Sequence, residues 1–111
     1  PGRALRVGRG TSKDLKTSIK FYLASARKGS SKAQYFLGTF YAEGHGIYKD
    51  YREAEKWLRE AVRNNDADAK AYLGYLLEFG IGLDRNLAEA KRLYRQAAKA
   101  GHRFARERLS N

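Results

Sequence analysis

Residues 33–61 read AQYFLGTFYAEGHGIYKDYREAEKWLREA, and the same pattern returns 36 residues later as AKAYLGYLLEFGIGLDRNLAEAKRLYRQA over residues 69–97. Three glycines mark the register, because Gly38, Gly44 and Gly46 recur as Gly74, Gly80 and Gly82. A fixed period of roughly 20 to 50 residues is typical of stacked repeats, whose units cannot bury their apolar faces alone. The sequence therefore predicts a solenoid, which favours a binding surface over an active site.

Each unit is predicted to form two helices joined by a glycine loop. In the second helix apolar residues recur at the helical period, and the stripes are Leu15, Ser18, Phe21, Tyr22, Ser25 and Ala26, then Tyr51, Ala54, Trp57, Leu58, Ala61 and Val62, then Leu87, Ala90, Leu93, Tyr94, Ala97 and Ala98. The first helix spans about 31–42 and 68–78, with a buried stripe of Phe36, Leu37, Phe40 and Tyr41, matched by Tyr72, Leu73, Leu76 and Leu77. A glycine inside a helix costs about 1 kcal/mol relative to alanine. Its recurrence at Gly38 and Gly74 therefore predicts close packing of helices.

The helix ends carry repeated signals. Asp50 and Asn86 precede Glu53 and Glu89 by three residues, the spacing of a capping box, and Asp14 occupies the same register position. At the other end Gly29, Asn65 and Gly101 align, and both residue types tolerate the left-handed conformation that closes a helix. These columns are therefore expected to be structural.

The register divides the chain into a partial repeat (1–30), two complete repeats (31–66 and 67–102) and the start of another (103–111). Neither end resembles the polar cap of a complete array, so we expect a fragment of a longer protein. The longest apolar stretch, residues 71–77, is far shorter than the roughly 20 residues of a membrane span. The absence of cysteine excludes disulfides and a cysteine nucleophile.

The repeat resembles the Sel-1-like repeat family of the tetratricopeptide-like superfamily. The matching positions in one unit are Ala33, Leu37, Gly38, Tyr41, Gly44, Gly46, Ile47, Asp50, Ala54, Trp57, Leu58 and Ala61. The resemblance implies an all-α superhelix of antiparallel helix pairs whose first helices line a concave surface. It also implies a scaffold or adaptor that binds proteins. Bacterial envelope or cytoplasm and eukaryotic adaptor complexes all remain open, so the localisation is unknown.

The charge distribution supports a second interpretation of the function. The chain has a formal net charge of +11. Residues 1–36 hold nine basic side chains and one acidic one, and the basic residues are Arg3, Arg6, Arg9, Lys13, Lys16, Lys20, Arg27, Lys28 and Lys32. Such a field attracts acidic protein segments, nucleic acid or other polyanions. A module that binds nucleic acid or another polyanion is thus the alternative, although these basic residues do not recur from unit to unit as a base-per-repeat reader requires.

Catalysis has little support in the sequence. His45 and His102 fall in separate turns without an obvious orienting carboxylate nearby in sequence, which is typical of solvated turn residues. The acidic residues are expected on exposed helix faces and caps, without the pocketed pair that acid–base chemistry needs. The Gly-x-Gly loops follow a helix rather than a strand, which disfavours phosphate binding. We therefore predict no catalytic residue, no cofactor and no metal site.

The partner is expected on first-helix positions that face away from the buried stripe, by resemblance to tetratricopeptide repeats. These positions are Arg3, Arg6, Lys32, Tyr35, Thr39, Glu43, Asp68, Ala71, Tyr75, Glu78 and Phe79. Tyr35, Tyr75 and Phe79 break the repeat, and non-recurring aromatic residues suit specific contacts. The expected partner is an extended or helical segment with acidic residues toward Arg3 and Arg6. Self-association is also expected through apolar residues near the two ends, Leu5, Val7, Phe104 and Leu109.

Overall fold

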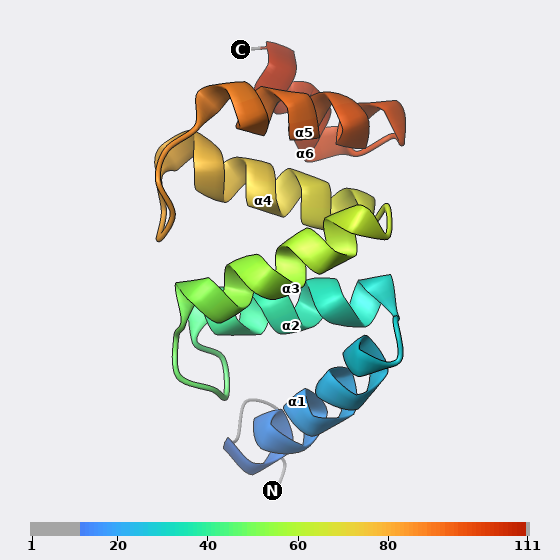
Figure 1. Cartoon of the computed structure of the whole chain (residues 1–111), viewed down its shortest axis with the longest axis vertical. Helices are drawn as coiled ribbons and strands as arrows, with labels where there is room; N and C mark the ends of the chain where they lie inside the picture. The colour runs from blue at the N-terminus through green and yellow to red at the C-terminus, as the bar shows by residue number, and fades with distance from the viewer. Residues whose placement is uncertain (1–11, 111) are drawn as a thin grey trace, which may run out of the picture.

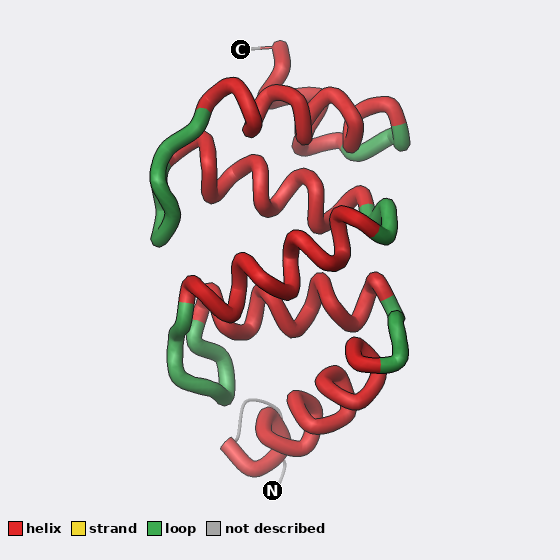
Figure 2. The backbone as a smooth tube through the Cα atoms, viewed as in Figure 1, coloured by secondary structure: helices red, strands yellow, loops and turns green. Residues whose placement is uncertain are grey.

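The computed structural model describes residues 12–110, with the backbone alone for residues 12–14. Within the described residues, six helices follow one another along the long axis (Figure 1). They are α1 (Ser12–Arg27), α2 (Ser31–Glu43), α3 (Tyr51–Arg63), α4 (Ala67–Phe79), α5 (Leu87–Lys99) and α6 (Arg103–Ser110). Short loops join them, and residues 12–110 contain no strand (Figure 2). The prediction of an all-α solenoid is confirmed.

Helix pairs form the packing unit, because α2 packs mainly on α3, and α4 mainly on α5. Leu37, Leu58 and Leu73 are completely buried in the core. The mid-helix glycines explain the close approach within each pair. A Cβ on Gly38 would lie 2.7 Å from Leu58 Cγ, and one on Gly74 would lie 2.9 Å from Tyr94 Cε1. The prediction of close packing at these two glycines is confirmed.

The starts of α3 and α5 follow the sequence signals with one exception. The Asp50 carboxylate accepts from the Glu53 N–H (3.2 Å), and the Asn86 side chain accepts from the Glu89 N–H (3.0 Å). The reciprocal half of the capping box is not made. The Asp50 N–H donates instead to the Tyr41 carbonyl (2.9 Å), and the Asn86 N–H to the Leu77 carbonyl (2.8 Å). The glycine loop brings the end of the preceding helix to this donor, so the glutamates are left for other partners.

At the C-terminal ends, the expected left-handed residues are confirmed. Gly29, Asn65 and Gly101 have φ angles of 100°, 65° and 92°. Each follows a second helix and turns the chain into the next unit.

No helix within residues 12–110 is both long and apolar enough to cross a membrane.

The predicted stripe of the first unit is wrong in part. Phe21 is 66% exposed, whereas Ile19, which the stripe omitted, is buried. Phe21 aligns with Trp57 and Leu93, but α3 and α5 each have a preceding described helix to pack against, and α1 is the first described helix. Asp14 was expected at a helix start, yet α1 begins at Ser12, so Asp14 lies inside the helix.

Candidate partner-binding site

An open groove of about 310 Å³ lies along the first helices of three successive units. It is almost wholly apolar, and its lining residues come from α2, α4 and the start of α6: Tyr35, Asp68, Ala71, Tyr72, Tyr75, His102 and Phe104. The predicted residues Tyr35, Asp68, Ala71 and Tyr75 are thus brought together. We call this feature the aromatic groove.

Aromatic rings form a continuous row along the groove. The Tyr35 and Tyr72 ring centroids are 6.3 Å apart, and the rings are nearly perpendicular at 86°. Tyr72 and Tyr75 are 6.3 Å apart, and Tyr75 and Phe104 are 6.1 Å apart at 73°. Tyr75 and Phe104 are 36% and 37% exposed, while Tyr35 is half-buried and packs against the core. The exposed end of the row is therefore at Tyr75 and Phe104.

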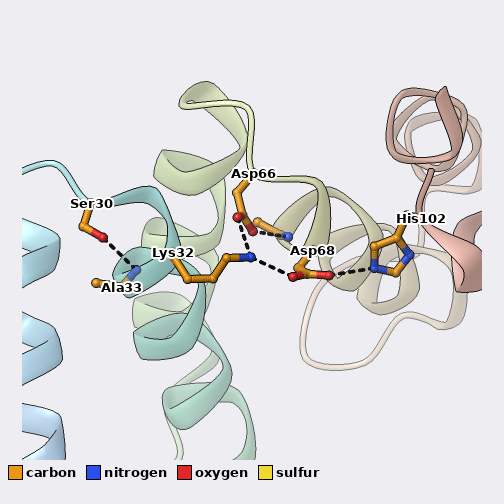
Figure 3. A network of polar contacts seen from close by, with 7 residues as sticks. Ser30, Lys32, Ala33, Asp66, Asp68 and His102 are labelled. Carbon is orange, nitrogen blue, oxygen red and sulfur yellow. Dashed lines mark hydrogen bonds and ion pairs between the residues drawn. The ribbon is translucent and has the colours of Figure 1, made fainter. Parts of the chain in front are cut away.

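A polar network beside the groove joins the two complete units (Figure 3). The Lys32 ammonium lies 2.8 Å from Asp66 Oδ1 and 2.7 Å from Asp68 Oδ2. Asp68 Oδ1 lies 2.9 Å from His102 Nε2. The hydrogen bond from Lys32 is the main reason why the pKa of Asp68 is below its ordinary value. The starts of α2, α4 and α6 are thus tied together by one chain of contacts.

His102 differs from its prediction as a solvated turn residue. Its side chain is 21% exposed, and Nδ1 accepts the Ala105 N–H at 3.4 Å, which caps the start of α6. We therefore assign the ring proton to Nε2, which donates to Asp68. The 36-residue register contains a signal for this role, since His102 aligns with the N-caps Ser30 and Asp66.

The other histidine also has a carboxylate partner. His45 Nε2 lies 3.0 Å from Glu43 Oε1. The expectation that neither histidine has a carboxylate nearby in sequence is therefore wrong for His45. For His45 the partner is only two residues away in sequence, and for His102 it lies 34 residues away at the start of α4.

Several predicted contact residues are occupied within the chain. The Thr39 hydroxyl donates to the Phe36 carbonyl of its own helix at 2.8 Å. The Glu43 carboxylate accepts from the Tyr72 hydroxyl at 2.9 Å. Ala71 is buried, so it forms the floor of the groove rather than a free surface. Arg3 and Arg6 lie outside the described residues.

The two predicted residues at the end of α4 contact α6. The Glu78 carboxylate accepts from the Tyr94 hydroxyl at 2.8 Å and forms an ion pair with Arg108. Phe79 is 51% exposed, and the Arg108 guanidinium lies 5.2 Å from its ring centroid. Glu78 is therefore held in an inter-unit contact, whereas one side of Phe79 remains accessible.

Glu78 gives a testable dependence of stability on pH. The hydrogen bond from Arg108 holds the pKa of Glu78 below its ordinary value. Because the unfolded state binds this proton more readily, the stabilisation is present above the unfolded pKa and is lost as the pH falls through the folded pKa. We expect Glu78→Gln to flatten the fall in the free energy of unfolding between about pH 5 and pH 3, measured by urea denaturation. Arg108→Gln should flatten it in the same way, and three parallel curves would contradict this assignment.

Basic residues form a second surface feature. The side chains of Arg9 and Lys13 fall outside the described part, while Lys16, Lys20, Arg27 and Lys28 are exposed on or just after α1. A cleft of about 600 Å³ between α5 and α6 is lined by Arg92, Arg95, Gln96, Ala98, Lys99 and Leu109, and none of these described residues is acidic. Counting charge by unit missed this cleft, because its three cations share one face of α5.

The fold and the groove together define a class of protein, an α-solenoid of tetratricopeptide-like helix pairs with an aromatic face on its first helices. The sequence matches the Sel1 repeat over residues 2–30, 31–66 and 67–102. The chain therefore belongs to the Sel1 repeat family. Sel1-repeat proteins are generally protein-interaction modules and are typically non-catalytic scaffolds.

Solved structures support the same assignment. A Sel1 repeat protein from Oxalobacter formigenes is 42% identical, with a TM-score of 0.75 over 81% of this chain and 37% of that chain. A protective antigen with an SLR fold from uropathogenic Escherichia coli strains is 30% identical, with a TM-score of 0.81 over 85% of this chain and 20% of that chain. The cysteine-rich protein B of Helicobacter pylori is 25% identical, with a TM-score of 0.68 over 89% of this chain and 97% of that chain. A search of curated proteins found no match.

Proposed function

We propose that the chain is a non-catalytic interaction module that holds a segment of a protein partner in the aromatic groove. The observation that carries this proposal is the row of aromatic rings across α2, α4 and α6, with Tyr75 and Phe104 each more than a third exposed. Contiguous exposed apolar surface commonly marks an interaction site. Tyrosine is enriched among the residues that dominate binding energy.

The contacts of His102 support a structural role. Nδ1 accepts from the Ala105 N–H and Nε2 donates to Asp68, so both ring nitrogens have partners. A general base needs a free nitrogen within reach of a substrate proton. The imidazole beside the groove is therefore better suited to joining α4 and α6 than to proton transfer.

Tyr75→Ala tests the proposal. Peptides are first selected from a random library against the immobilised chain, and their affinities are then measured by calorimetry for each variant. We expect Tyr75→Ala to weaken binding by roughly 1–3 kcal/mol, or about 5- to 150-fold, because it removes an exposed ring that lines the groove. Tyr48→Ala is the matched control, since Tyr48 is 95% exposed on the loop after α2. Equal affinities for the chain and both variants would place the binding site elsewhere.

Tyr35→Ala is a less suitable test of the groove than Tyr75→Ala. Tyr35 is half-buried and packs against the core, so its removal lowers the stability of the fold as well as the area of the groove. We expect the melting temperature to stay nearly unchanged only in Tyr75→Ala, because Tyr75 is 36% exposed. The binding affinities of both variants should therefore be interpreted together with their melting temperatures.

A module that binds nucleic acid or another polyanion is the second candidate, favoured by the basic cleft between α5 and α6. Calorimetric titration with a random single-stranded oligonucleotide distinguishes the two candidate functions. Phosphate contacts release counterions, so affinity must fall steeply between about 50 and 200 mM salt. If no binding is detected at about 50 mM salt, only the proposal of a protein partner remains.

Self-association through Phe104 and Leu109 remains a prediction, and Leu5 and Val7 lie outside the described residues.

A further inference from the structure

The aromatic groove combines ring faces with a carboxylate. Tyr35 and Tyr72 stand at 86° to each other, and Tyr75 and Phe104 at 73°, so ring planes border the groove in more than one orientation. Asp68 lines the same groove. Aromatic side chains attract cations to their faces through the ring quadrupole, and boxes of such rings recognise alkylated ammonium groups.

The charge at the edge of the groove is negative. Asp66 and Asp68 share the single ammonium of Lys32, and His102 is neutral when Nδ1 accepts the Ala105 N–H. Two carboxylates therefore face one cation. The hydroxyl of Tyr72, which also lines the groove, donates to the Glu43 carboxylate at 2.9 Å, which makes that ring richer in electrons.

Rings in and beside this groove already hold cations from the chain itself. The Lys32 ammonium lies 5.1 Å from the Tyr35 ring centroid, and the Arg108 guanidinium lies 5.2 Å from that of Phe79. Both distances are within the roughly 6 Å over which cation–π attraction is significant. Tyr75 and Phe104 carry no such cation among the described contacts, and they form the exposed end of the row.

Hydrogen bonding decides which cation fits. Asp68 Oδ1 already accepts from His102, and Asp68 Oδ2 from Lys32. A primary ammonium brings three N–H donors, and each needs an acceptor when it leaves water. A trimethylammonium group has the same charge and no N–H donor. An almost wholly apolar groove therefore suits the methylated cation better.

We propose that the aromatic groove binds an N-methylated lysine side chain of the partner segment, with its charge over Tyr75 and Phe104 and facing Asp68. The inference rests on the proposed function and specifies the anchor of the partner. At this groove the anchor is cationic, in contrast to the acidic segment expected toward Arg3 and Arg6. A volume of about 310 Å³, at the small end of ligand pockets, suits one side chain.

The test compares three small probes by NMR titration of the whole chain. The probes are N-acetyl-trimethyllysine methylamide, the same compound with unmodified lysine, and a neutral isostere in which carbon replaces the side-chain nitrogen. We expect the trimethyllysine probe to bind about fivefold or more tightly than either of the others, with the largest shifts at the Tyr75 and Phe104 ring protons. Phosphocholine serves as a fourth probe, and tighter binding of phosphocholine than of trimethyllysine would assign the site to a lipid headgroup and overturn the proposal.

Tyr75→Leu separates charge recognition from apolar contact. Leucine keeps apolar volume and removes the ring face, so the preference for the charged probe should disappear while binding of the neutral isostere remains. Tyr48→Leu, on an exposed loop outside the groove, should leave the preference unchanged. Equal binding of the charged probe and its neutral isostere to the native chain, or no shifts up to about 10 mM probe, would overturn the inference. The proposed function would survive either result if library peptides still lose affinity in Tyr75→Ala.

Discussion

Gly82→Ala should lower the free energy of unfolding by about 2–5 kcal/mol. Gly82 lies in the loop between α4 and α5 with φ +74°, where a residue with a Cβ pays about 1–2 kcal/mol. The added Cβ would also lie 2.1 Å from Cγ of the Tyr51 ring. That ring must move, and overpacking of this kind costs about 1–3 kcal/mol. Urea denaturation followed by circular dichroism measures the loss, together with a melting temperature at least about 8 °C lower.

Gly101→Ala is the matched control, because Gly101 has φ +92° and no atom within 4 Å of an added Cβ. It should cost only the conformational part, about 1–2 kcal/mol. The difference between the two variants measures the contact between the α4–α5 loop and the start of α3. Tyr51→Ala should recover part of that difference in the Gly82→Ala background, and equal costs for Gly82→Ala and Gly101→Ala would disprove the tight contact.

The sequence predicted the features that recur within each unit. Helix pairs, left-handed ends and mid-helix glycines all repeat at 36 residues, because every unit must solve the same packing problem. Gly38 and Gly74 illustrate this, since each faces a large side chain of the following helix. The stripe failed at Phe21 because burial depends on a neighbouring helix as well as on the register.

Contacts between units were the part that sequence reasoning missed. Lys32 and Asp68 are 36 residues apart, and Arg59 and Glu89 are 30 apart, so each pair joins successive units. The two residues of each pair carry opposite charges, so a comparison of aligned positions for similar residues does not reveal them. A search for complementary charges at separations near 30 and 36 would have found both pairs. The contact of His102 was also missed, because its partner Asp68 lies 34 residues earlier in the sequence.

The candidate site also combines features that the sequence predicted with contacts that it did not predict. Tyr35 and Tyr75 were singled out because they do not recur, and both line the aromatic groove. Phe104 was assigned instead to an exposed end, although it follows the start of α6 and closes the ring row beside Tyr75. Whether a first-helix residue lines the groove or joins another unit, as Glu78 does, depends on what the next unit places opposite it.

Leu58→Ala should lower the free energy of unfolding by about 2–5 kcal/mol, since Leu58 is completely buried against α2. The matched control is Leu109→Ala, whose side chain is 37% exposed at the end of α6. It should cost well under half as much, because it leaves a smaller cavity and removes less buried surface. Similar losses in the two variants would mean that Leu58 is not part of a tightly packed core.

Leu58→Ala should also reduce the cost of a second substitution, Gly38→Ala. In the native chain the added Cβ would lie 2.7 Å from Leu58 Cγ and 2.9 Å from Cδ2. Overpacking of about 1–3 kcal/mol then outweighs the gain of about 1 kcal/mol from helix propensity, so the variant is less stable. In the Leu58→Ala background the nearest remaining atom is the Ala54 carbonyl oxygen at 3.3 Å, still a tight contact with backbone, so the same substitution should become clearly less destabilising. A double-mutant cycle by urea denaturation should give a coupling energy of at least about 1 kcal/mol, and a Gly38→Ala variant that stabilises the native chain would contradict the role of this glycine in helix packing.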